Sequence, residues 1–346
     1  ALSTNILGYT GEAGTESLRQ KISDHYQHTY GVHVGPERII TTMGASGAIL
    51  VVFTASFNPG DRVAIASPGY PCYHNILQAV GCDVVTVEVD ASTNFQLTAA
   101  QLDEADADSS RPIRGVVVAS PSNPTGTMLT PLELQELAQW CAQRKATLVS
   151  DEIYHGILYG TVEQSTAAAF SSAVVISSFS KYFSMTGWRL GWLVVPPRSA
   201  ESERWEQAVR ALQQNLFISA PTLAQLAVAS AAFSLESIDE LDGHVHRYSQ
   251  NRNLLMEALP ALGFEDISRA DGAFYVWARC DNVAGKEGSG GLCNRVLDHA
   301  RTAITPGFDF DKRRGNSYVR FSYSGSEATI EEAIRRLHAT RARWSA

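Results

Sequence analysis

Six short runs of β-branched and other apolar residues alternate with helical patterns through the first two-thirds of this 346-residue chain. Nearly continuous apolar strands are typical of a sheet buried on both faces, and intervening helices let neighbouring strands run parallel. The six runs are VAIASP (63–68), DVVTVEV (83–89), GVVVASP (115–121), TLVSDE (147–152), AVVISSFS (173–180) and LGWLVVP (190–196). The pattern predicts an α/β fold with a mostly parallel central sheet and helices on both faces.

The helix before the fifth run has the clearest boundaries. Thr130 is suited to cap it, Pro131 to occupy its first turn and Glu133 to complete a capping box. The apolar residues that follow recur on one helical face, namely Leu134, Leu137, Ala138 and Cys141.

The pattern changes after about residue 235. A long helical stretch is followed by two strand-like runs, GAFYVWAR and YVRFSYS, and by a closing helix over 330–343. We therefore expect a large domain over residues 1–235 and a smaller α+β domain over 236–346.

The stretch GKEGSGG at 285–291 superficially resembles a phosphate-binding loop. It lacks the GK[ST] ending and a preceding strand, so we expect a flexible surface loop.

Charge and cysteine content narrow the classes of partner. The net charge is −8, which argues against nucleic-acid and membrane-surface binding, since both need clustered Lys and Arg. The five cysteines are scattered without a CxxC pair, so we expect neither disulfides nor a metal site. No apolar run is long enough for a bilayer, and no signal peptide is visible. We expect a cytoplasmic protein that acts on small molecules.

Four polar clusters lie at or just after the ends of predicted strands. They are SPGYPCY (67–73), SPSNPTG (120–126), SDEIY (150–154) and SFSK (178–181). Open α/β sheets bind ligands at the carboxyl edge of their strands, so these clusters predict one polar site. Taken singly, SPSNPTG could form only a turn and Asp151 could merely cap a helix.

Lys181 and Arg189 are the cations of SFSKYFSMTGWRLG, a stretch without acidic residues. A lysine after a buried strand pays a desolvation cost that favours its neutral, nucleophilic amine, which can form a Schiff base with an aldehyde. Arg189 keeps its charge and has a planar fork suited to phosphate. An aldehyde that bears a phosphate describes pyridoxal 5'-phosphate (PLP), for which Asp151 could supply the anion beside the pyridine nitrogen and Tyr70 an aromatic plate. The alternative is that both cations are ordinary surface residues.

The motifs SNPTG, DEIY, SFSK and GWRLG, in this order and spacing, resemble the PLP-dependent aminotransferases of class I/II, which have fold type I. The resemblance runs from about Tyr9 to the closing helix. It implies that Lys181 holds PLP as an internal aldimine and carries the proton between substrate and cofactor. It also implies that Asp151 keeps the pyridine nitrogen protonated and that Tyr70 stacks on the ring.

The resemblance also implies how the rest of the cofactor is held. Tyr154 and Asn123 would hydrogen-bond its phenolic oxygen. Its phosphate would be bound by Ser178, Arg189, the backbone of Ala45, the hydroxyl of Ser46 and, from the partner subunit of a homodimer, Tyr9. The turn GASG at 44–47 would open a helix whose N-terminus favours an anion.

Arg320, in YVRFSYS, matches the arginine that clamps the substrate α-carboxylate, with Asn123 beside it. A guanidinium binds a carboxylate through two parallel hydrogen bonds, which orients the amino acid. Without the resemblance, Arg320 could equally be a strand-edge residue paired with an acid such as Glu327.

Only eight residues precede Tyr9, whereas family members usually have a longer N-terminal arm, so we expect that arm to be missing from this sequence. The arm helps to read the substrate side chain, so the sequence says least about specificity.

The resemblance predicts transfer of an amino group from an L-amino acid to a 2-oxo acid by a ping-pong mechanism. A carbon–sulfur β-lyase would use the same Lys181, Asp151 and Arg320. A ligand-sensing regulator is the more remote alternative, because no basic helix-turn-helix segment precedes Tyr9.

Overall fold

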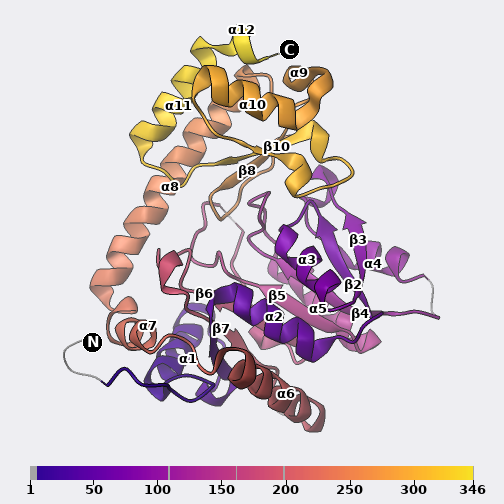
Figure 1. Cartoon of the computed structure of the whole chain (residues 1–346), viewed down its shortest axis with the longest axis vertical. Helices are drawn as coiled ribbons and strands as arrows, with labels where there is room; N and C mark the ends of the chain where they lie inside the picture. The colour runs from indigo at the N-terminus through magenta and orange to yellow at the C-terminus, as the bar shows by residue number, and fades with distance from the viewer. Residues whose placement is uncertain (1–5, 108–109, 161, 198, 346) are drawn as a thin grey trace.

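The computed structural model describes residues 6–107, 110–160, 162–197 and 199–345. These residues form a seven-stranded sheet in the order β1-β7-β6-β5-β4-β2-β3 and a three-stranded sheet in the order β8-β10-β9 (Figure 1). The strands of the larger sheet are β1 (Ile39–Thr42), β2 (Arg62–Ser67), β3 (Asp83–Glu88), β4 (Ile113–Ala119), β5 (Thr147–Asp151), β6 (Ala173–Ser178) and β7 (Gly191–Val194). All six predicted strands are present, and β1 is an additional strand of four residues.

Strands β3, β2, β4, β5 and β6 run parallel, whereas β7 is antiparallel to both of its neighbours, β6 and β1. The link from β6 to β7 contains only the short 3-10 turn Thr186–Trp188. Parallel neighbours need a longer crossover, usually a helix, so this short link reverses the chain direction. The predicted α/β fold with a mostly parallel sheet is confirmed.

Helices cover both faces of the larger sheet. Alternate residues of β4 point to opposite faces, so Val116 and Val118 pack with α1, α4 and α5, while Val117 packs with α2, α3 and α6. The six helices are α1 (Glu16–Tyr30), α2 (Gly44–Ser56), α3 (Pro71–Ala79), α4 (Ala99–Ala105), α5 (Pro131–Arg144) and α6 (Ala200–Phe217). All six residues of β6 are buried, as expected for a strand covered on both sides.

Helix α5 begins as predicted. The Thr130 hydroxyl accepts a hydrogen bond from the Glu133 amide, and the Glu133 carboxylate accepts one from the Thr130 amide, which is a complete capping box. Its four predicted apolar positions are buried against the sheet.

The long helix α8 (Leu235–Ala261) runs from the region of α7 (Thr222–Ala227) to the second sheet (Figure 1). That sheet is antiparallel and consists of β8 (Tyr275–Arg279), β9 (Thr305–Pro306) and β10 (Tyr318–Ser322). Its helices are α9 (Asp281–Ala284), α10 (Gly288–Ala300), α11 (Glu327–Ala339) and α12 (Arg341–Trp344). A second apolar core, with Trp344, Phe264 and Leu259 at its centre, holds this part together.

The prediction of a flexible loop at 285–291 is wrong. Residues Gly285–Glu287 form a 3-10 turn, and Gly288 opens helix α10. A Cβ on Gly290 would lie 3.0 Å from the ring of Phe308, so the glycine permits close packing here. Tertiary contact therefore overrides the weak helical propensity of these glycines.

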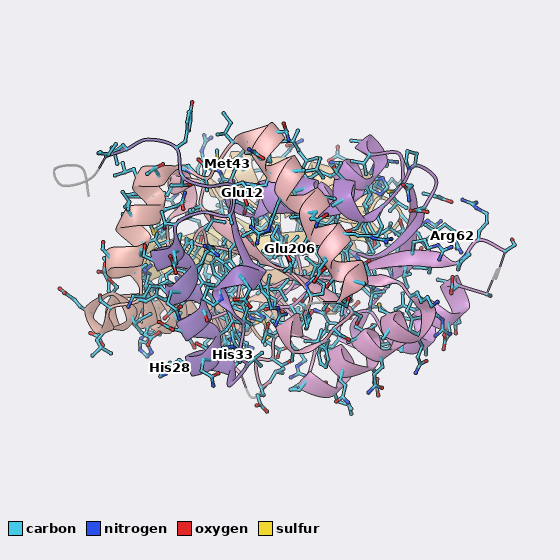
Figure 2. All side chains as sticks on the ribbon, turned by 90° about the horizontal axis from the view of Figure 1, so that it is seen from below. Glu12, His28, His33, Met43, Arg62 and Glu206 are labelled. Carbon is cyan, nitrogen blue, oxygen red and sulfur yellow. The ribbon has the colours of Figure 1, made fainter. Side chains whose placement is uncertain are left out.

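The N-terminal segment is tied to β1 and α6 by backbone and charged contacts. The Ala13 carbonyl accepts a hydrogen bond from the Thr41 amide of β1 at 3.0 Å. Arg210 of α6 pairs with both Glu12 and Glu206, at 3.1 and 2.7 Å, and Figure 2 shows these two acids on the same side of the molecule.

The five cysteines are free thiols. Within the described ranges, no single helix meets the length and hydropathy needed to cross a bilayer; the bent pair Ser202–Phe217 and Thr222–Ala232 meets them only together.

Candidate active site

The four predicted polar clusters meet at the carboxyl edge of β2, β4, β5 and β6, around a cavity of about 350 Å³. The lining includes every residue predicted for the site except Ser178 and Tyr9, namely Ala45, Ser46, Tyr70, Asn123, Asp151, Tyr154, Lys181, Arg189 and Arg320. Parallel strands end at a common edge, so residues far apart in sequence come together there.

Lys181 follows β6 and is half-buried beside two aromatic rings. Its Nζ lies 5.6 Å from the ring centroid of Tyr154 and 5.9 Å from that of Phe274. Burial is the main cause that lowers the pKa of the Lys181 amine below its usual value. The charge of Asp151 raises this pKa, while the guanidinium groups of Arg320 and Arg189 lower it. The lowered pKa makes the neutral amine, which is the nucleophilic form, easier to reach.

Asp151, the last residue of β5, is 3% exposed. Its carboxylate accepts hydrogen bonds from the Tyr73 hydroxyl at 2.5 Å and from the Ile153 amide at 3.1 Å. Burial raises the pKa of Asp151 to about 6, although both hydrogen bonds and the charge of Lys181 act to lower it. A buried carboxylate in this setting can hold a protonated ring nitrogen.

Sequence reasoning missed Tyr73, which both lines the cavity and holds Asp151. Pro71 begins α3, so Tyr70 is its N-cap and Tyr73 lies in its first turn. The rings of Tyr70 and Tyr73 meet edge to face with centroids 5.6 Å apart. The spacing YxxY at the start of a helix after a strand was the signal that could have identified Tyr73.

Arg189 lies over the N-terminus of α2. It has φ 50°, and its Nη1 donates to the Thr186 carbonyl at 3.0 Å. A Cβ on Gly44, which has φ +68°, would lie 2.5 Å from Arg189 Nη2, so only glycine permits this approach. In the described part of the chain neither Arg189 nor Lys181 forms an ion pair with an acid. A guanidinium beside a helix N-terminus favours binding of a phosphate-like anion.

Arg320 projects from β10 of the small sheet toward the same cavity. Its Nη1 donates to Asn123 Oδ1 at 2.9 Å, and its Nη2 donates to Thr305 Oγ1 at 3.3 Å. Its guanidinium lies between the rings of Tyr275 and Phe310, 4.3 and 4.7 Å from their centroids.

Burial lowers the pKa of Arg320 from its usual value, and its Nε is buried without a partner. Among the described residues it makes no ion pair with Glu327 or any other acid. A buried cation without a counter-ion is costly, and a ligand carboxylate would supply the missing charge.

Tyr154 and Asn123 lie between these charged groups. The Tyr154 hydroxyl donates to the Tyr275 hydroxyl at 3.1 Å, and both tyrosines line the cavity. Burial raises the pKa of Tyr154 well above its usual value, so it stays protonated and can donate a hydrogen bond.

Ser178 and Tyr9 lie outside the cavity lining. The Ser178 hydroxyl is within hydrogen-bond distance of the Leu190 carbonyl, at 3.1 Å, and of Ser180 Oγ, at 2.9 Å. Ser180, which immediately precedes Lys181 and was not predicted, lines the cavity instead. Tyr9 is 83% exposed on the N-terminal segment, so its expected contact with a partner's cofactor stays a prediction.

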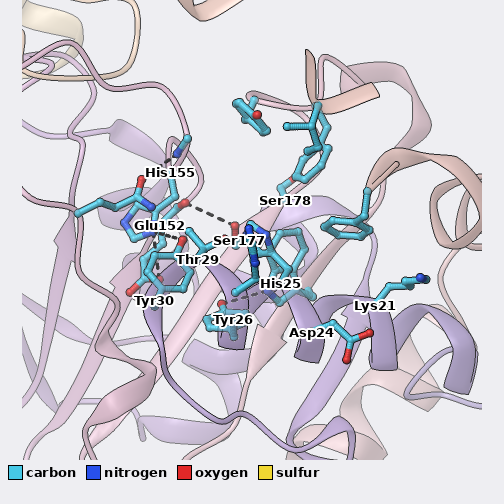
Figure 3. Close-up of a pocket in the computed structure, with 18 of the residues that line it drawn as sticks. Lys21, Asp24, His25, Tyr26, Thr29, Tyr30, Glu152, His155, Ser177 and Ser178 are labelled. Atoms are coloured by element: carbon cyan, nitrogen blue, oxygen red, sulfur yellow. Dashed lines mark hydrogen bonds and ion pairs between the residues drawn. The ribbon is translucent and has the colours of Figure 1, made fainter. Parts of the chain in front are cut away.

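A second cavity, of about 450 Å³, lies between α1, the start of α8 and the ends of β5 and β6 (Figure 3). Its buried polar groups pair with one another: the Tyr30 hydroxyl and His155 Nδ1 are 2.8 Å apart. Burial lowers the pKa of His25 to about 4 and that of His155 to about 3, so both rings are neutral near pH 7. Because its buried groups are already paired or neutral, we place the chemistry in the first cavity.

Glu152 lines this second cavity, and we predict that its ionisation makes the stability of the fold depend on pH. Its carboxylate accepts hydrogen bonds from Thr166 Oγ1 and the Ala167 amide, both at 2.7 Å, and burial raises its pKa from 4.5 to about 7. As pH rises from about 4.5 to about 7, the unfolded chain loses this proton before the folded chain does. Stability is therefore expected to fall over that window, by about 3 kcal/mol from Glu152.

Glu152→Gln is expected to remove that part of the pH dependence. Urea unfolding of the protein without cofactor, at several pH values between 4.5 and 7.5, measures it. Glu136→Gln, on the exposed side of α5, is the matched control and should keep the wild-type slope. An unchanged slope in Glu152→Gln would contradict the prediction.

Comparison with known proteins identifies the family. A family model described as aminotransferase class I and II matches residues 1–337. The valine–pyruvate aminotransferase of Mycobacterium tuberculosis is 46% identical over 339 residues, which are 97% of this chain and 84% of that protein. A crystal structure of an aminotransferase from Mycobacterium tuberculosis superposes with a TM-score of 0.91 at 45% identity, covering 98% of this chain and 85% of that one. A putative aminotransferase from Silicibacter pomeroyi superposes with a TM-score of 0.85 at 40% identity, covering 94% and 84%.

These matches span nearly the whole chain and agree with the cavity geometry. The chain therefore belongs to the class I and II aminotransferases.

Proposed function

We propose that this enzyme transfers the amino group of an L-amino acid to a 2-oxo acid through PLP, in two half-reactions that share one site. The observation that carries the proposal is the cavity at the strand ends. It brings together a lysine with a lowered pKa, a buried aspartate and two arginines that form no ion pair with any acid in the described residues.

The donor set of the cavity fits PLP. The guanidinium of Arg189, whose approach to the start of α2 Gly44 permits, and the first amides of α2 would hold the phosphate. Lys181 would bind the aldehyde carbon, and Asp151 would face the pyridine nitrogen. Residues that would hold the remaining parts of the ring are Tyr70, Asn123 and Tyr154. When bound, PLP supplies an aldehyde for the amine and a conjugated ring that withdraws electrons from the substrate α-carbon.

The chain's own residues would then orient the substrate and move its proton. Arg320 binds the α-carboxylate through its fork, with Asn123 holding the guanidinium in place. Asp151, whose carboxylate Tyr73 orients, would face the pyridine nitrogen and, when ionised, would favour its protonated form. Once the substrate amine has replaced it on the aldehyde carbon, Lys181 Nζ would accept the proton of the substrate α-carbon and later donate it. The lowered pKa leaves more of this amine in the neutral form that can accept a proton.

Assembly and compartment follow as parts of the proposal. We infer a homodimer in which Tyr9 reaches the partner's phosphate site. The apolar side chains of Ile6 and Leu7, 94% and 45% exposed, support burial of this segment by a second copy. The five free thiols support a reducing compartment, the cytoplasm.

The first substrates to test are valine and pyruvate. They are the pair in the name of the Mycobacterium tuberculosis relative that is 46% identical to this chain.

The test is the absorption spectrum of the purified, PLP-loaded enzyme before and after each amino acid is added without any 2-oxo acid. We expect the yellow absorbance to disappear with one group of amino acids and to return when a 2-oxo acid is added. Stable yellow colour with every amino acid, together with pyruvate release from cystathionine or cysteine conjugates, would overturn the proposal in favour of a β-lyase.

A further inference from the structure

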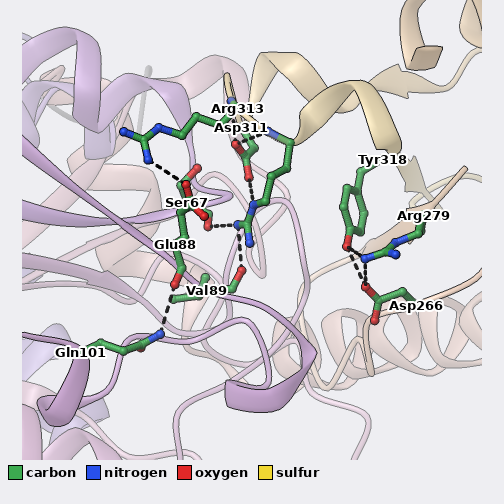
Figure 4. A network of polar contacts seen from close by, with 10 residues as sticks. Ser67, Glu88, Val89, Gln101, Asp266, Arg279, Asp311, Arg313 and Tyr318 are labelled. Carbon is green, nitrogen blue, oxygen red and sulfur yellow. Dashed lines mark hydrogen bonds and ion pairs between the residues drawn. The ribbon is translucent and has the colours of Figure 1, made fainter. Parts of the chain in front are cut away.

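The loop over residues 307–315 connects β9 to β10. It lies where the part of the chain around the smaller sheet contacts the part around the larger sheet (Figure 4). Its Phe310 covers one face of the Arg320 guanidinium, 4.7 Å from the ring centroid. The Phe310 carbonyl also accepts a hydrogen bond from the Gly69 amide at 3.1 Å. Gly69 precedes Tyr70, so this loop touches the segment that carries the aromatic wall of the cavity.

Asp311 gives this loop its shape. It is 2% exposed, and its carboxylate accepts hydrogen bonds from the amides of Arg313 and Arg314, at 2.9 and 3.0 Å. The other carboxylate oxygen accepts a hydrogen bond from Arg314 Nε at 3.0 Å. These bonds aim the Arg314 guanidinium away from its own loop.

The Arg314 guanidinium reaches the large sheet. Its Nη2 donates to the Ser67 carbonyl at 2.7 Å and to the Val89 carbonyl at 3.0 Å (Figure 4). Ser67 ends β2, and Val89 directly follows β3. One side chain thus joins a buried carboxylate of the small domain to two strand ends of the large domain. The planar guanidinium holds its donors in fixed directions that match these three acceptors.

We propose that Arg314 is a positioning residue for amino transfer, a role that rests on the proposed function. It holds the Ser67–Tyr70 segment against the loop over 307–315. Tyr70 comes from the part of the chain around the larger sheet, and Phe310 and Arg320 come from the part around the smaller sheet. The contact thereby holds Tyr70 at a fixed position relative to Phe310 and Arg320 around the substrate. Arg314 touches neither substrate nor cofactor and acts through these neighbours.

Arg313 offers a matched control in the same loop. It also crosses the domain contact, by an ion pair to Glu88 at 2.9 Å, but both side chains are largely exposed, 76% and 40%. Exposed pairs of this kind contribute little to stability. Arg313→Gln removes the same charge from the adjacent position and leaves the three acceptors of Arg314 satisfied.

The experiment compares Arg314→Gln with Arg313→Gln in the PLP-loaded full chain. For Arg314→Gln we expect the KM of the amino acid to rise about tenfold, with kcat within roughly twofold and PLP retained, because the charge-assisted hydrogen bonds are lost. Hydrogen exchange at the Gly69 amide should become faster in the same variant. Arg313→Gln should match the wild type in both measurements.

A second variant, Arg314→Lys, keeps the positive charge and serves if Arg314→Gln does not fold. Its ammonium cannot serve three acceptors in the same geometry, so we expect an intermediate rise in KM.

Three outcomes would overturn the proposal. Faster exchange without a change in KM would assign the contact a purely structural role. A rise in KM in Arg313→Gln equal to that in Arg314→Gln would assign the effect to charge alone. If the wild-type enzyme transfers no amino group, the proposed function is wrong and this role of Arg314 is wrong with it. Hydrogen exchange at the Gly69 amide would still show whether Arg314 holds the Ser67–Tyr70 segment.

Discussion

Replacement of Lys181 by alanine is expected to abolish amino transfer while the chain stays folded. The substitution removes the amine that would bind the cofactor aldehyde and the group that would carry the substrate proton. General acid–base catalysis and covalent anchoring together predict a loss of roughly 10⁴-fold in kcat. The fold should persist because Lys181 is half-buried and, in the described part of the chain, has no ion pair to lose.

Amino transfer from valine to pyruvate and the urea unfolding midpoint are the two measurements for this variant. Lys286→Ala, an exposed lysine of the small domain, is the control and should be fully active. Retained transaminase activity in Lys181→Ala would contradict the assignment of this residue.

The second large effect is expected for Arg320→Ala. Loss of a buried, charge-assisted contact to the substrate carboxylate should raise the KM of the amino acid roughly 100-fold. PLP should remain bound, because Arg320 contacts Asn123 and Thr305, whereas the phosphate is assigned to Arg189 and the first amides of α2. Steady-state kinetics with the amino acid varied, together with the cofactor absorbance, measure both quantities.

Arg335→Ala is the control for this experiment. Arg335 is 67% exposed on α11 and pairs only with its neighbour Glu332 in the described structure, so its KM should equal that of the wild type. Arg320→Lys keeps the charge but loses the two-pronged geometry, and we expect an intermediate KM. Loss of PLP from Arg320→Ala, with little change in KM, would show that the residue is misplaced.

The central sheet could be predicted because buried parallel strands have a strong local signature. Four of the six predicted strands contain four or more buried apolar or small residues, and the polar clusters after β2, β4, β5 and β6 lie at the common carboxyl edge by topology alone. Strand β1 escaped prediction because IITT is only four residues long and no helix pattern isolates it.

Some of the chemistry of the site could be predicted from the sequence, whereas the rest depends on how the chain packs. The nucleophilic character of Lys181 follows from a lysine placed after a buried strand. Its pKa also depends on burial and on the charges of Asp151, Arg320 and Arg189, of which Asp151 and Arg320 are distant in sequence. Ser178 was predicted to line the cavity, but Ser180 lines it instead, because of the way the chain turns after β6. No local pattern encodes that turn.

Contacts among the elements around the smaller sheet were likewise invisible in the sequence. The glycine-rich stretch at 285–291 has the composition of a loop, yet it becomes helical because its glycines let Phe308 approach closely. Arg320 could have paired with an acid, but the folded chain places it beside two aromatic rings, and no acid among the described residues forms an ion pair with it.

The sequence by itself determined the periodicity of strands and helices, the capping of α5 and the types of reactive group at the strand ends. These are local properties, set by side-chain chemistry and by spacing along the chain. Tertiary structure alone decided which groups meet: Tyr73 with Asp151, Asn123 with Arg320, and Arg314 with the ends of β2 and β3. The physical reason is that burial, hydrogen bonding and charge act through space, between residues whose distance the sequence does not state.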